Sequence, residues 1–304
     1  MELNKKKALG GNLALLTAAF IWGTSFVAQS VGMESVEGFT FNGIRMLLGS
    51  AALIPLIVFL QLKKAKTDTR TKEEKKKQGF IQLKCGIICG IILFCASNLQ
   101  QFAFNYTSSG KIGFITALYM LLVPVFGLFL KQKQRLFVWL AVLIGCFGAY
   151  LLCVDGEMSI GKGELLTLGC AVFYAFHILY IDSVVDKVDG IILSCTQFFV
   201  VGVISVICMF IFETPQLVNI NAAIVPILYS GIMSSGIAYT LQIVGQKNTQ
   251  PAVASLLMCL ESVFAVLAGW VVLHEALSTR EMIGCIVMFA AIILTKLPER
   301  KKNI

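Results

Sequence analysis

Three ionisable residues stand inside apolar stretches of this chain. Glu261 lies in the middle of "SLLMCLESVFAVLAGW" (residues 255–270), Arg45 follows "FNGI", and His177 lies in "AVFYAFHILY". An ionised carboxylate inside hydrocarbon costs about 3 kcal/mol on insertion scales, so it must be neutral, paired or hydrated. Histidine is the side chain whose charge responds most readily near neutral pH. These residues therefore indicate an internal ion pair, a proton exchange or a polar path.

Each of the three residues has two interpretations. Glu261 could pair with Arg45 or Lys111 inside the protein, or it could face a cavity, alternate between protonated and charged states, and meet a substrate amine. Arg45 could extend its guanidinium to the membrane interface, or it could meet a carboxylate of the protein or of a substrate. His177 could be a neutral histidine bonded to a neighbour, or it could titrate.

The composition indicates what surrounds these residues. Of 304 residues, 57% are hydrophobic and 14% are charged, whereas about 25% of the residues in a soluble domain are charged. Apolar runs long enough to cross about 30 Å of hydrocarbon recur along the whole chain. The sequence predicts an all-α polytopic membrane protein with ten transmembrane helices, at residues 9–30, 38–61, 80–103, 110–130, 135–153, 163–181, 190–212, 222–243, 251–273 and 280–297.

The charges predict the orientation of these helices. Lys and Arg residues gather at span ends, in residues 4–7, 63–77, 131–135 and 299–302. If the N-terminus lies inside, all of the 25 Lys and Arg residues except Arg45, Lys111, Lys162 and Arg280 are on the cytoplasmic side. We therefore predict a multi-pass protein of the plasma (inner) membrane with both termini cytoplasmic.

The net charge of +8 does not indicate a nucleic-acid partner, because aromatic residues do not alternate with the basic ones. Residues 62–79 form the one long linker, which is too polar for the bilayer and is expected to be disordered. Residues 298–304 are expected to form a basic cytoplasmic tail.

The ten cysteines lie in or beside apolar runs without a CxxC pair, so we predict packing roles, no metal site and no cofactor.

The first span has a second interpretation, because its lysines, its apolar run and "AQS" at 28–30 also resemble a secretory signal. The run is long for a signal sequence, and its removal would break an internal repeat. We therefore expect the span to be retained.

That repeat divides the chain into residues 1–153 and 163–297. Blocks of the first half match blocks of the second in the same order: 12–26 with 164–178, 114–126 with 252–264, and "IGC" at 144–146 with 283–285. The first match pairs Trp22 with Tyr174. Each half holds five spans, and because five is odd, the second half must enter the membrane from the opposite side. The arrangement is therefore predicted to be two inverted five-helix repeats, which many secondary transporters use to form a substrate site between the halves.

Three longer segments resemble the EamA family of the drug/metabolite transporter superfamily. Residues 20–53 resemble its first two helices, with an aromatic-Gly pair and an early Arg; residues 105–126 resemble its fourth helix; and residues 255–294 resemble its ninth and tenth helices, with Glu261 at the usual acidic position. The resemblance implies a ten-helix exporter of amino acids, drugs or other metabolites. It also implies a structural or gating role for Glu261, since the family keeps an acid there across unrelated substrates. The family usually has proline after this acid, whereas Ser262 follows here, so a helix break is not implied at this point.

Polar side chains should turn away from lipid, and spacing of three or four residues places them on one helix face. Four spans carry such stripes: Trp22, Ser25 and Gln29; Asn98, Gln101 and Asn105; Tyr174 and His177; and Ser235, Tyr239 and Gln242. Single Ser or Gln residues are also common in ordinary packing between membrane helices, and the aromatic residues could be plain core. We predict a central cavity walled by the first, third, sixth and eighth spans, closed by the fourth and ninth, with the fifth and tenth at the periphery. The predicted substrate path consists of Trp22, Ser25, Arg45, Asn98, Gln101, Tyr119, Tyr174, His177, Tyr239 and Glu261.

These features favour a secondary transporter that moves a small polar metabolite, most plausibly by export of an amino acid or a related compound. Its partners would be the lipid bilayer and the small-molecule substrate, and the protein would be a monomer or a homodimer. Two ways of driving the cycle stay open: antiport with protons as the coupling ion, or facilitated diffusion without one. "IGKGELL" at 160–166 lacks phosphate-loop spacing, which argues against a nucleotide-driven pump. The alternatives are an intramembrane enzyme, against which HExxH, GxSxG and paired catalytic aspartates are missing, and a scaffold or receptor, which would need larger loops.

Overall fold

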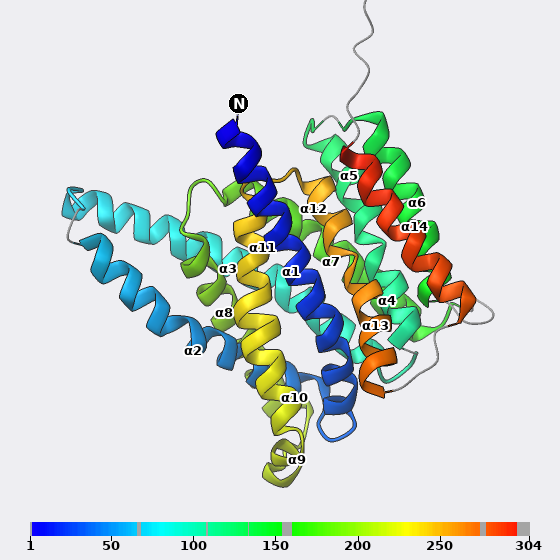
Figure 1. Cartoon of the computed structure of the whole chain (residues 1–304). Helices are drawn as coiled ribbons and strands as arrows, with labels where there is room; N and C mark the ends of the chain where they lie inside the picture. Colours follow the sequence, from blue (N-terminus) through cyan, green and yellow to red (C-terminus); the bar gives the residue numbers. More distant parts are fainter. Residues whose placement is uncertain are drawn as a thin grey trace, which may run out of the picture.

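The chain folds into a bundle of helices with short connections (Figure 1). The computed structural model describes residues 2–65, 68–107, 109–132, 134–153, 160–273 and 278–296. The predicted tail, 298–304, lies outside the described residues.

The described helices group into the ten spans predicted from the sequence. In the first half these are α1 (Glu2–Met33), α2 (Gly38–Ala65), α3 (Lys72–Ala103), α4 (Ser109–Ala117) with α5 (Tyr119–Phe129), and α6 (Leu136–Cys153). In the second half they are α7 (Lys162–Val184), α8 (Gly190–Phe212), α10 (Ile224–Tyr229) continuing through the π-helix η1 (Ser230–Ala238) into α11 (Tyr239–Gln246), α12 (Pro251–Met258) with α13 (Glu261–Leu273), and α14 (Thr279–Lys296). The short α9 (Leu217–Ala222) connects α8 to α10. Eight of the spans are long and apolar enough to cross a membrane, and α6 and α14 add a pair of 18 residues each.

The two halves run in opposite directions. Near the start of α1, the Asn12 side chain accepts a hydrogen bond from Thr249, just after the end of α11. The last turn of α7 reaches this same end of α11, because Val184 and Ile243 belong to one buried apolar cluster. The first helix of one half therefore begins where the first helix of the other half ends, as two inverted repeats require.

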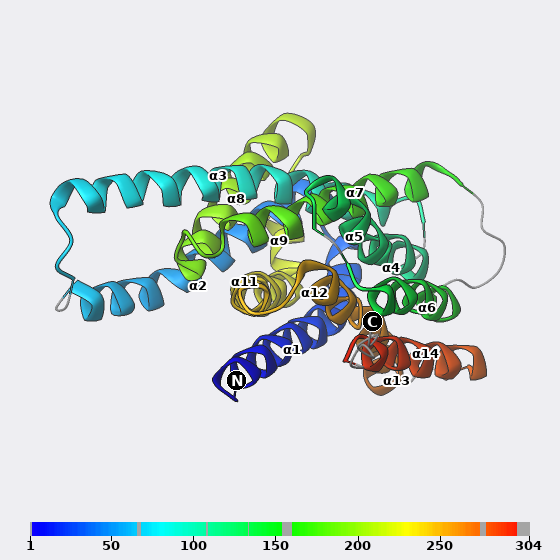
Figure 2. The same cartoon turned by 90° about the horizontal axis from the view of Figure 1, so that it is seen from above.

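The α6–α14 pair lies at one edge of the bundle, opposite the ends of α2 and α3 (Figure 2). A Cβ on Gly148 would lie 3.0 Å from the backbone N of Met288, and one on Gly284 would lie 3.0 Å from the backbone N of Leu152. The two helices therefore cross antiparallel with their backbones in close contact, a geometry that glycine permits. The predicted peripheral position of the fifth and tenth spans is confirmed.

Glycine spacing also fixes the position of α3. A Cβ on Gly86 would lie 2.5 Å from the Thr196 side chain, and one on Gly90 would lie 2.7 Å from Val200 Cβ. Both contacts are made with α8, so the "GIICG" segment at 86–90 packs within the fold.

The prediction of disorder in residues 62–79 is wrong for the residues that the structure describes. The helices α2 and α3 extend beyond the apolar core to Ala65 and from Lys72, and together they form a long arm (Figure 2). A capping box starts α3, in which Thr71 accepts from the Glu74 backbone N and the Glu74 carboxylate accepts from the Thr71 backbone N. Hydrogen bonds from Arg70 hold the pKa of Asp68 well below its usual range. Capping and local charge pairs thus order a segment that its composition alone assigns to coil.

The fourth and ninth spans are each interrupted. The backbone N–H of Leu118 bonds back three residues to Ile115, and the N–H of Leu260 bonds back three residues to Leu257. Three-residue bonds tighten a helix locally and change its direction. Glu261 consequently becomes the first residue of α13, even though Ser262 stands where the family usually has proline.

Candidate functional site

A cavity lies between the two halves, at the level of these interruptions. Aromatic residues form much of its wall: Trp22, Phe26, Tyr119, Tyr174 and Tyr239. Polar residues form most of the rest: Gln29, Arg45, Gln100, Thr116, Ser234, Gln242 and Glu261. The first half contributes through α1 to α5 and the second through α7, η1, α11, α12 and α13, so the cavity lies at the interface between the repeats.

Arg45 lies in the cavity wall and does not reach the membrane interface. Its side chain is 2% exposed, its Nε donates to Asn42 Oδ1 at 2.8 Å, and its Nη1 donates to Gln29 Oε1 at 3.0 Å. The interpretation of Arg45 as an interfacial residue is therefore wrong. Asn42 is in turn held by Ser97, to which its Nδ2 donates at 2.9 Å. This chain of amides fixes the guanidinium without neutralising it.

Glu261 is the carboxylate of the cavity. It is 8% exposed, and Tyr119 Oη donates to its Oε1 at a long 3.4 Å. As the first residue of α13, it lies at the positive end of a helix dipole. A Cβ on Gly23 would lie 2.6 Å from the Glu261 carbonyl oxygen, so only glycine lets α1 approach this turn so closely.

The two partners expected for Glu261 inside the protein are engaged elsewhere. Lys111 pairs with Glu164 at 3.8 Å, and Arg45 bonds to amides. Within the described part of the chain, no ion pair within 4.0 Å involves Arg45 or Glu261. The interpretation in which Glu261 pairs with Arg45 or Lys111 is therefore wrong, because Glu164 pairs with Lys111 and the amide groups of Gln29 and Asn42 supply the acceptors that Arg45 needs.

The aromatic residues pack as two pairs across the repeats. The Trp22 and Tyr239 rings lie 4.8 Å apart, and the Tyr119 and Tyr174 rings lie 6.3 Å apart, both edge to face. The Tyr174 and Tyr239 hydroxyls lie 3.2 Å apart, and this contact joins the two pairs. The Trp22 indole N–H is buried with no hydrogen-bond partner, which leaves one free donor in the cavity wall.

Gln100 continues the polar wall on α3. It accepts from the Tyr174 hydroxyl at 3.3 Å, and its Nε2 donates to Thr116 Oγ1 at 3.3 Å. Sequence reasoning chose the neighbouring face of α3, that of Asn98 and Gln101. Since successive residues differ by about 100° around a helix, an error of one position moves the stripe away from the cavity.

Six of the ten residues predicted for the substrate path line this cavity: Trp22, Arg45, Tyr119, Tyr174, Tyr239 and Glu261. The other four are buried beside it in contacts between helices. Ser25 donates to Ser230 at 3.4 Å, and Asn98 donates to Ser205 at 3.2 Å. His177 Nε2 lies 2.9 Å from Gln197 Oε1, and Gln101 has neither amide atom bonded. The path as a whole stays a prediction.

A second residue that the sequence did not indicate is Ser234. The stripe on the eighth span was read with α-helical spacing, which selects Ser235. In the structure this segment is the π-helix η1, whose wider turn shifts the register, and Ser234 lines the cavity while Ser235 contacts Met46. Only the run of small residues "SGIMSSGIA" could have suggested an irregular helix.

Comparison with known proteins agrees with this architecture. The family model described as "EamA-like transporter family" matches residues 9–154 and, again, residues 161–297. The chain belongs to the EamA-like transporter family. It is therefore a membrane transporter and not an enzyme, with one family unit in each half. The resemblance seen in the sequence is confirmed.

Relatives within this family are themselves named as transporters. An "Uncharacterized transporter" of Archaeoglobus fulgidus is 26% identical over 96% of this chain and 87% of its own length. YoaV of Bacillus subtilis is 24% identical, covering 93% of this chain and 95% of its own length. YedA of Escherichia coli, named an inner membrane transporter, is 24% identical, covering 93% and 89%. A solved crystal structure superposes with a TM-score of 0.76 at 19% identity, over 94% of this chain and 96% of that one, which shows the shared fold.

Proposed function

We propose that this transporter moves small zwitterionic metabolites, of the amino-acid class, by alternating access of the cavity between the repeats. The observation that carries the proposal is the presence of two charged side chains in one cavity wall, Arg45 from the first half and Glu261 from the second. Among the described residues neither has an oppositely charged partner.

Charge balance supports this substrate class. An unpaired charge in a membrane interior is costly, so a ligand that supplies the missing partner gains most of its binding free energy there. A substrate carboxylate can accept two parallel hydrogen bonds from a guanidinium, and a substrate ammonium can meet a carboxylate. An amino acid carries both groups. The aromatic wall suits an apolar or flat side chain on the same molecule.

Alternating access is supported by the inverted halves and by the interrupted spans beside the cavity. Tyr119 and Glu261 each begin the second part of an interrupted span, and half-helix ends of this kind supply polar groups at the midplane of many transporters. Rocking of one half against the other would expose Arg45 and Glu261 first to one side of the membrane and then to the other.

The direction we propose is export across the inner membrane, with both termini cytoplasmic. Lysine and arginine at the N-terminal end of the bundle support this orientation through the positive-inside rule. The name of the Escherichia coli relative, an inner membrane transporter, supports the location. The transporter would act as a monomer or a homodimer.

Protons are the coupling ion that this cavity suits best. Glu261 lines the cavity and its carboxylate has one long hydrogen bond, so it can exchange a proton when the cavity hydrates. His177 is bonded to Gln197 between α7 and α8 and does not line the cavity. Glu261 is therefore our candidate for the coupling residue, in preference to His177.

The proposal is tested by transport into liposomes that contain the purified protein. A panel of amino acids and nucleobases is offered with and without a pH gradient, and the Glu261→Gln variant is measured in parallel. We expect at least one amino acid to move and the variant to lose its response to the gradient. No movement of any compound, together with a variant that behaves as the parent does, would contradict the proposal.

A further inference from the structure

The second helices of the two halves, α2 and α8, pack directly against each other. A Cβ on Gly43 would lie 3.2 Å from the Val206 backbone N, and one on Gly202 would lie 3.0 Å from the Leu47 backbone N. The pair is antiparallel and joins one repeat to the other. Any rocking of one half against the other must therefore loosen or tighten the contacts between α2 and α8 at the two ends of this pair.

At the end opposite the N-terminus, the carboxylate of Glu213 holds the start of α2. Glu213 follows the last residue of α8, and it accepts from Phe39 N at 2.7 Å, from Thr40 N at 2.8 Å and from Thr40 Oγ1 at 2.7 Å. The residue is 9% exposed. A carboxylate bound to the free N–H groups of a helix N-terminus makes strong, charge-assisted hydrogen bonds. We call this contact the Glu213 clasp.

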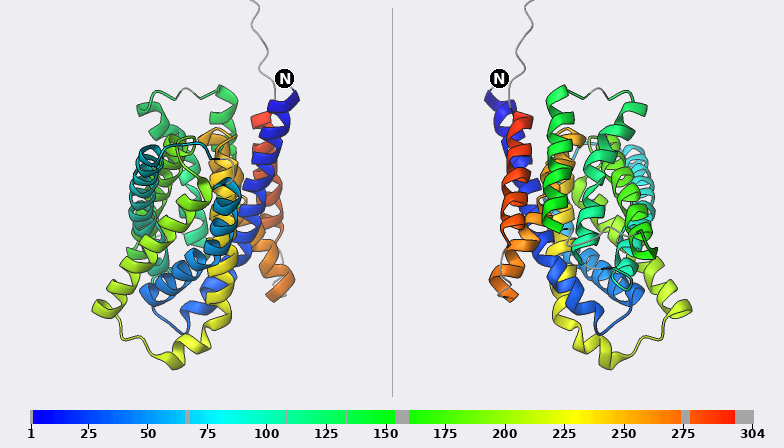
Figure 3. Two further views of the ribbon diagram at one scale, coloured as in Figure 1. Left: turned by 90° about the vertical axis from the view of Figure 1, so that its left-hand side faces the viewer. Right: turned by 90° about the vertical axis from the view of Figure 1, so that its right-hand side faces the viewer.

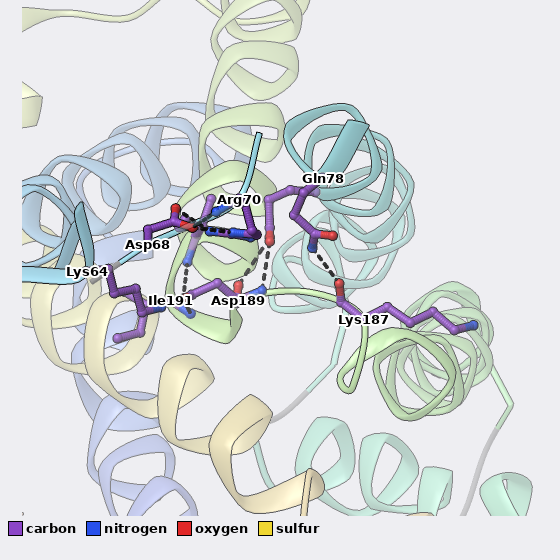
Figure 4. A network of polar contacts seen from close by, with 9 residues as sticks. Lys64, Asp68, Arg70, Gln78, Lys187, Asp189 and Ile191 are labelled. Atoms are coloured by element: carbon purple, nitrogen blue, oxygen red, sulfur yellow. Dashed lines mark hydrogen bonds and ion pairs between the residues drawn. The ribbon is translucent and has the colours of Figure 1, made fainter. Parts of the chain in front are cut away.

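At the N-terminal end the corresponding contact is more exposed. Lys64, near the end of α2, pairs with Asp189, which caps the start of α8 (Figure 4). The two side chains are 54% and 26% exposed. Gln82 exchanges two hydrogen bonds with the Asp189 backbone, and Gln78 donates to Lys187 O at 2.7 Å. An exposed ion pair contributes little because water competes for both partners. The two ends of the α2–α8 pair are thus closed by contacts of different strength.

Beside the first turns of α2, on α3, lie buried polar groups that have no hydrogen-bond partner among the described residues. Both amide atoms of Gln101 are unbonded, and so is Oδ1 of Asn98. Gln101 Cγ lies 3.6 Å from the Cβ position of Gly38, the first residue of α2. Unbonded amides inside a protein are rare, because each forfeits its hydrogen bonds to water. They would regain water if the start of α2 moved away from α3 and α8.

A hollow lies outside the clasp at the same end. Thr40 lines it, together with Glu37 and Asn105 and with residues that follow Glu213, among them Thr214 and Asn219. This end of the bundle is formed by α9 and the turn between α1 and α2 (Figure 3). The hollow, the clasp and the unbonded amides therefore gather at the first turns of α2, and the same helix leads from there to Arg45 in the cavity wall.

We propose that the Glu213 clasp is the gate of the path on this side, the predicted external side. It closes the cavity when Glu213 caps α2, and it opens when the start of α2 separates from the end of α8. The inference rests on the proposed alternating access, and it adds the residue that controls one of the two openings.

The test measures how fast a charged, membrane-impermeant methanethiosulfonate reaches a cysteine that is buried beside the clasp. Gln101→Cys in a cysteine-free chain, reconstituted in lipid nanodiscs, is the probe, because Gln101 is buried and its amide makes no bond that the substitution would break. Glu213→Gln, which keeps the size of the side chain and removes its charge, should raise the labelling rate about tenfold or more. Thr40→Val removes one of the three donors to the Glu213 carboxylate and should raise the labelling rate by a smaller factor. This variant replaces Glu213→Gln in the test if Glu213→Gln does not fold.

Two controls separate a gate from general loosening. Asp189→Asn makes the same charge change at the other end of the α2–α8 pair and should not raise labelling at residue 101. A second probe, Gln246→Cys, lies buried near the N-terminal end and should label no faster in Glu213→Gln. Unchanged labelling at residue 101, or faster labelling at both probes, would overturn the gate. The labelling experiment uses no substrate, so its result does not depend on transport. If labelling changes as expected but the protein transports no compound, the gate is supported and only the proposed function is contradicted.

Discussion

The central cavity and the α6–α14 contact are both formed by the two repeats, yet they differ in the kinds of side chain that form them. The cavity brings together five aromatic and seven polar or charged side chains from both halves. At the described α6–α14 contact, Gly148 and Gly284 instead bring the two backbones into direct contact. In lipid, where burial of apolar surface gives helices no reason to associate, small residues serve as the packing surface and polar residues are reserved for a path.

This difference indicates which substitutions should affect stability and which should affect transport. A change at the cavity alters charge balance around a ligand while the helices stay packed. A change at the α6–α14 contact alters helix packing far from any ligand.

Arg45 should give the largest effect. Arg45→Gln removes the positive charge, and a substrate carboxylate would then be buried unpaired, so transport should fall at least about 30-fold. Arg45→Lys keeps the charge and loses the planar fork, so it should retain part of the activity. Initial rates in liposomes measure both variants. Equal rates for Arg45→Gln and the parent would show that the guanidinium serves packing alone.

Glu261 should give the next effect. Glu261→Gln keeps the shape and the contact to Tyr119 but can neither pair with an ammonium nor release a proton, so transport should fall about tenfold. The variant should also stop responding to an imposed pH gradient. Tyr119→Phe is the matched control, since it removes the hydrogen bond from Tyr119 to the carboxylate and leaves the charge. Full gradient-driven transport by Glu261→Gln would exclude it as the coupling residue.

Gly284 should affect stability and leave specificity unchanged. A Cβ there would lie 2.9 Å from Leu152 Cγ and 3.0 Å from the Gly148 carbonyl oxygen, so Gly284→Val should destabilise the fold by about 1–3 kcal/mol through overpacking. Thermal unfolding in detergent measures this loss. Ile283→Val, on the exposed face next to it, is the control and should change little. A change in substrate preference in Gly284→Val would mean that the α6–α14 contact takes part in selection.

The Lys64–Asp189 ion pair should give the smallest effect. Partial burial alone would raise the pKa of Asp189, but the hydrogen bond and charge of Lys64, together with the backbone N–H groups of Ile191 and Ile192, outweigh it and hold that pKa below the ordinary value. Folding therefore favours the ionised carboxylate, so its stabilisation is present at neutral pH and is lost as the pH falls through the ordinary value and below it.

For an exposed pair the stabilisation is at most about 1 kcal/mol. Asp189→Asn should lower the melting temperature slightly at pH 7 and less at pH 3, whereas Asp186→Asn on the same connection should not show this difference. A loss that is equal at both pH values would contradict the role of the charge.

The sequence predicts the spans well because hydrophobic length and clustered charge are properties of single segments. The predicted 190–212 agrees with α8, and other span boundaries differ from the structure by a few residues at most, apart from helices that extend beyond the membrane, as α1, α2 and α3 do. Those extensions depend on caps and charge pairs such as Thr71–Glu74, which composition does not reveal.

The site is less predictable, because membership in a cavity depends on helix rotation. Aromatic residues at repeat-related positions, Trp22 and Tyr174, were found from the matched blocks and line the cavity. Gln100 and Ser234 were missed, since a one-residue difference in helix phase, or a π-helical turn, decides which of two adjacent polar residues faces inward. The bond of Arg45 to Gln29 was missed too, because contacts between α1 and α2 cannot be read from either helix alone.

The most direct measurement compares two substrates that differ only in the group Arg45 is proposed to bind. Transport of an amino acid and of its carboxamide is measured with the parent protein and with Arg45→Gln. The account predicts that the parent prefers the amino acid and that the variant loses this preference. An equal preference in the two proteins, or a parent that transports the carboxamide as fast as the amino acid, would contradict recognition of a carboxylate by the guanidinium in this cavity.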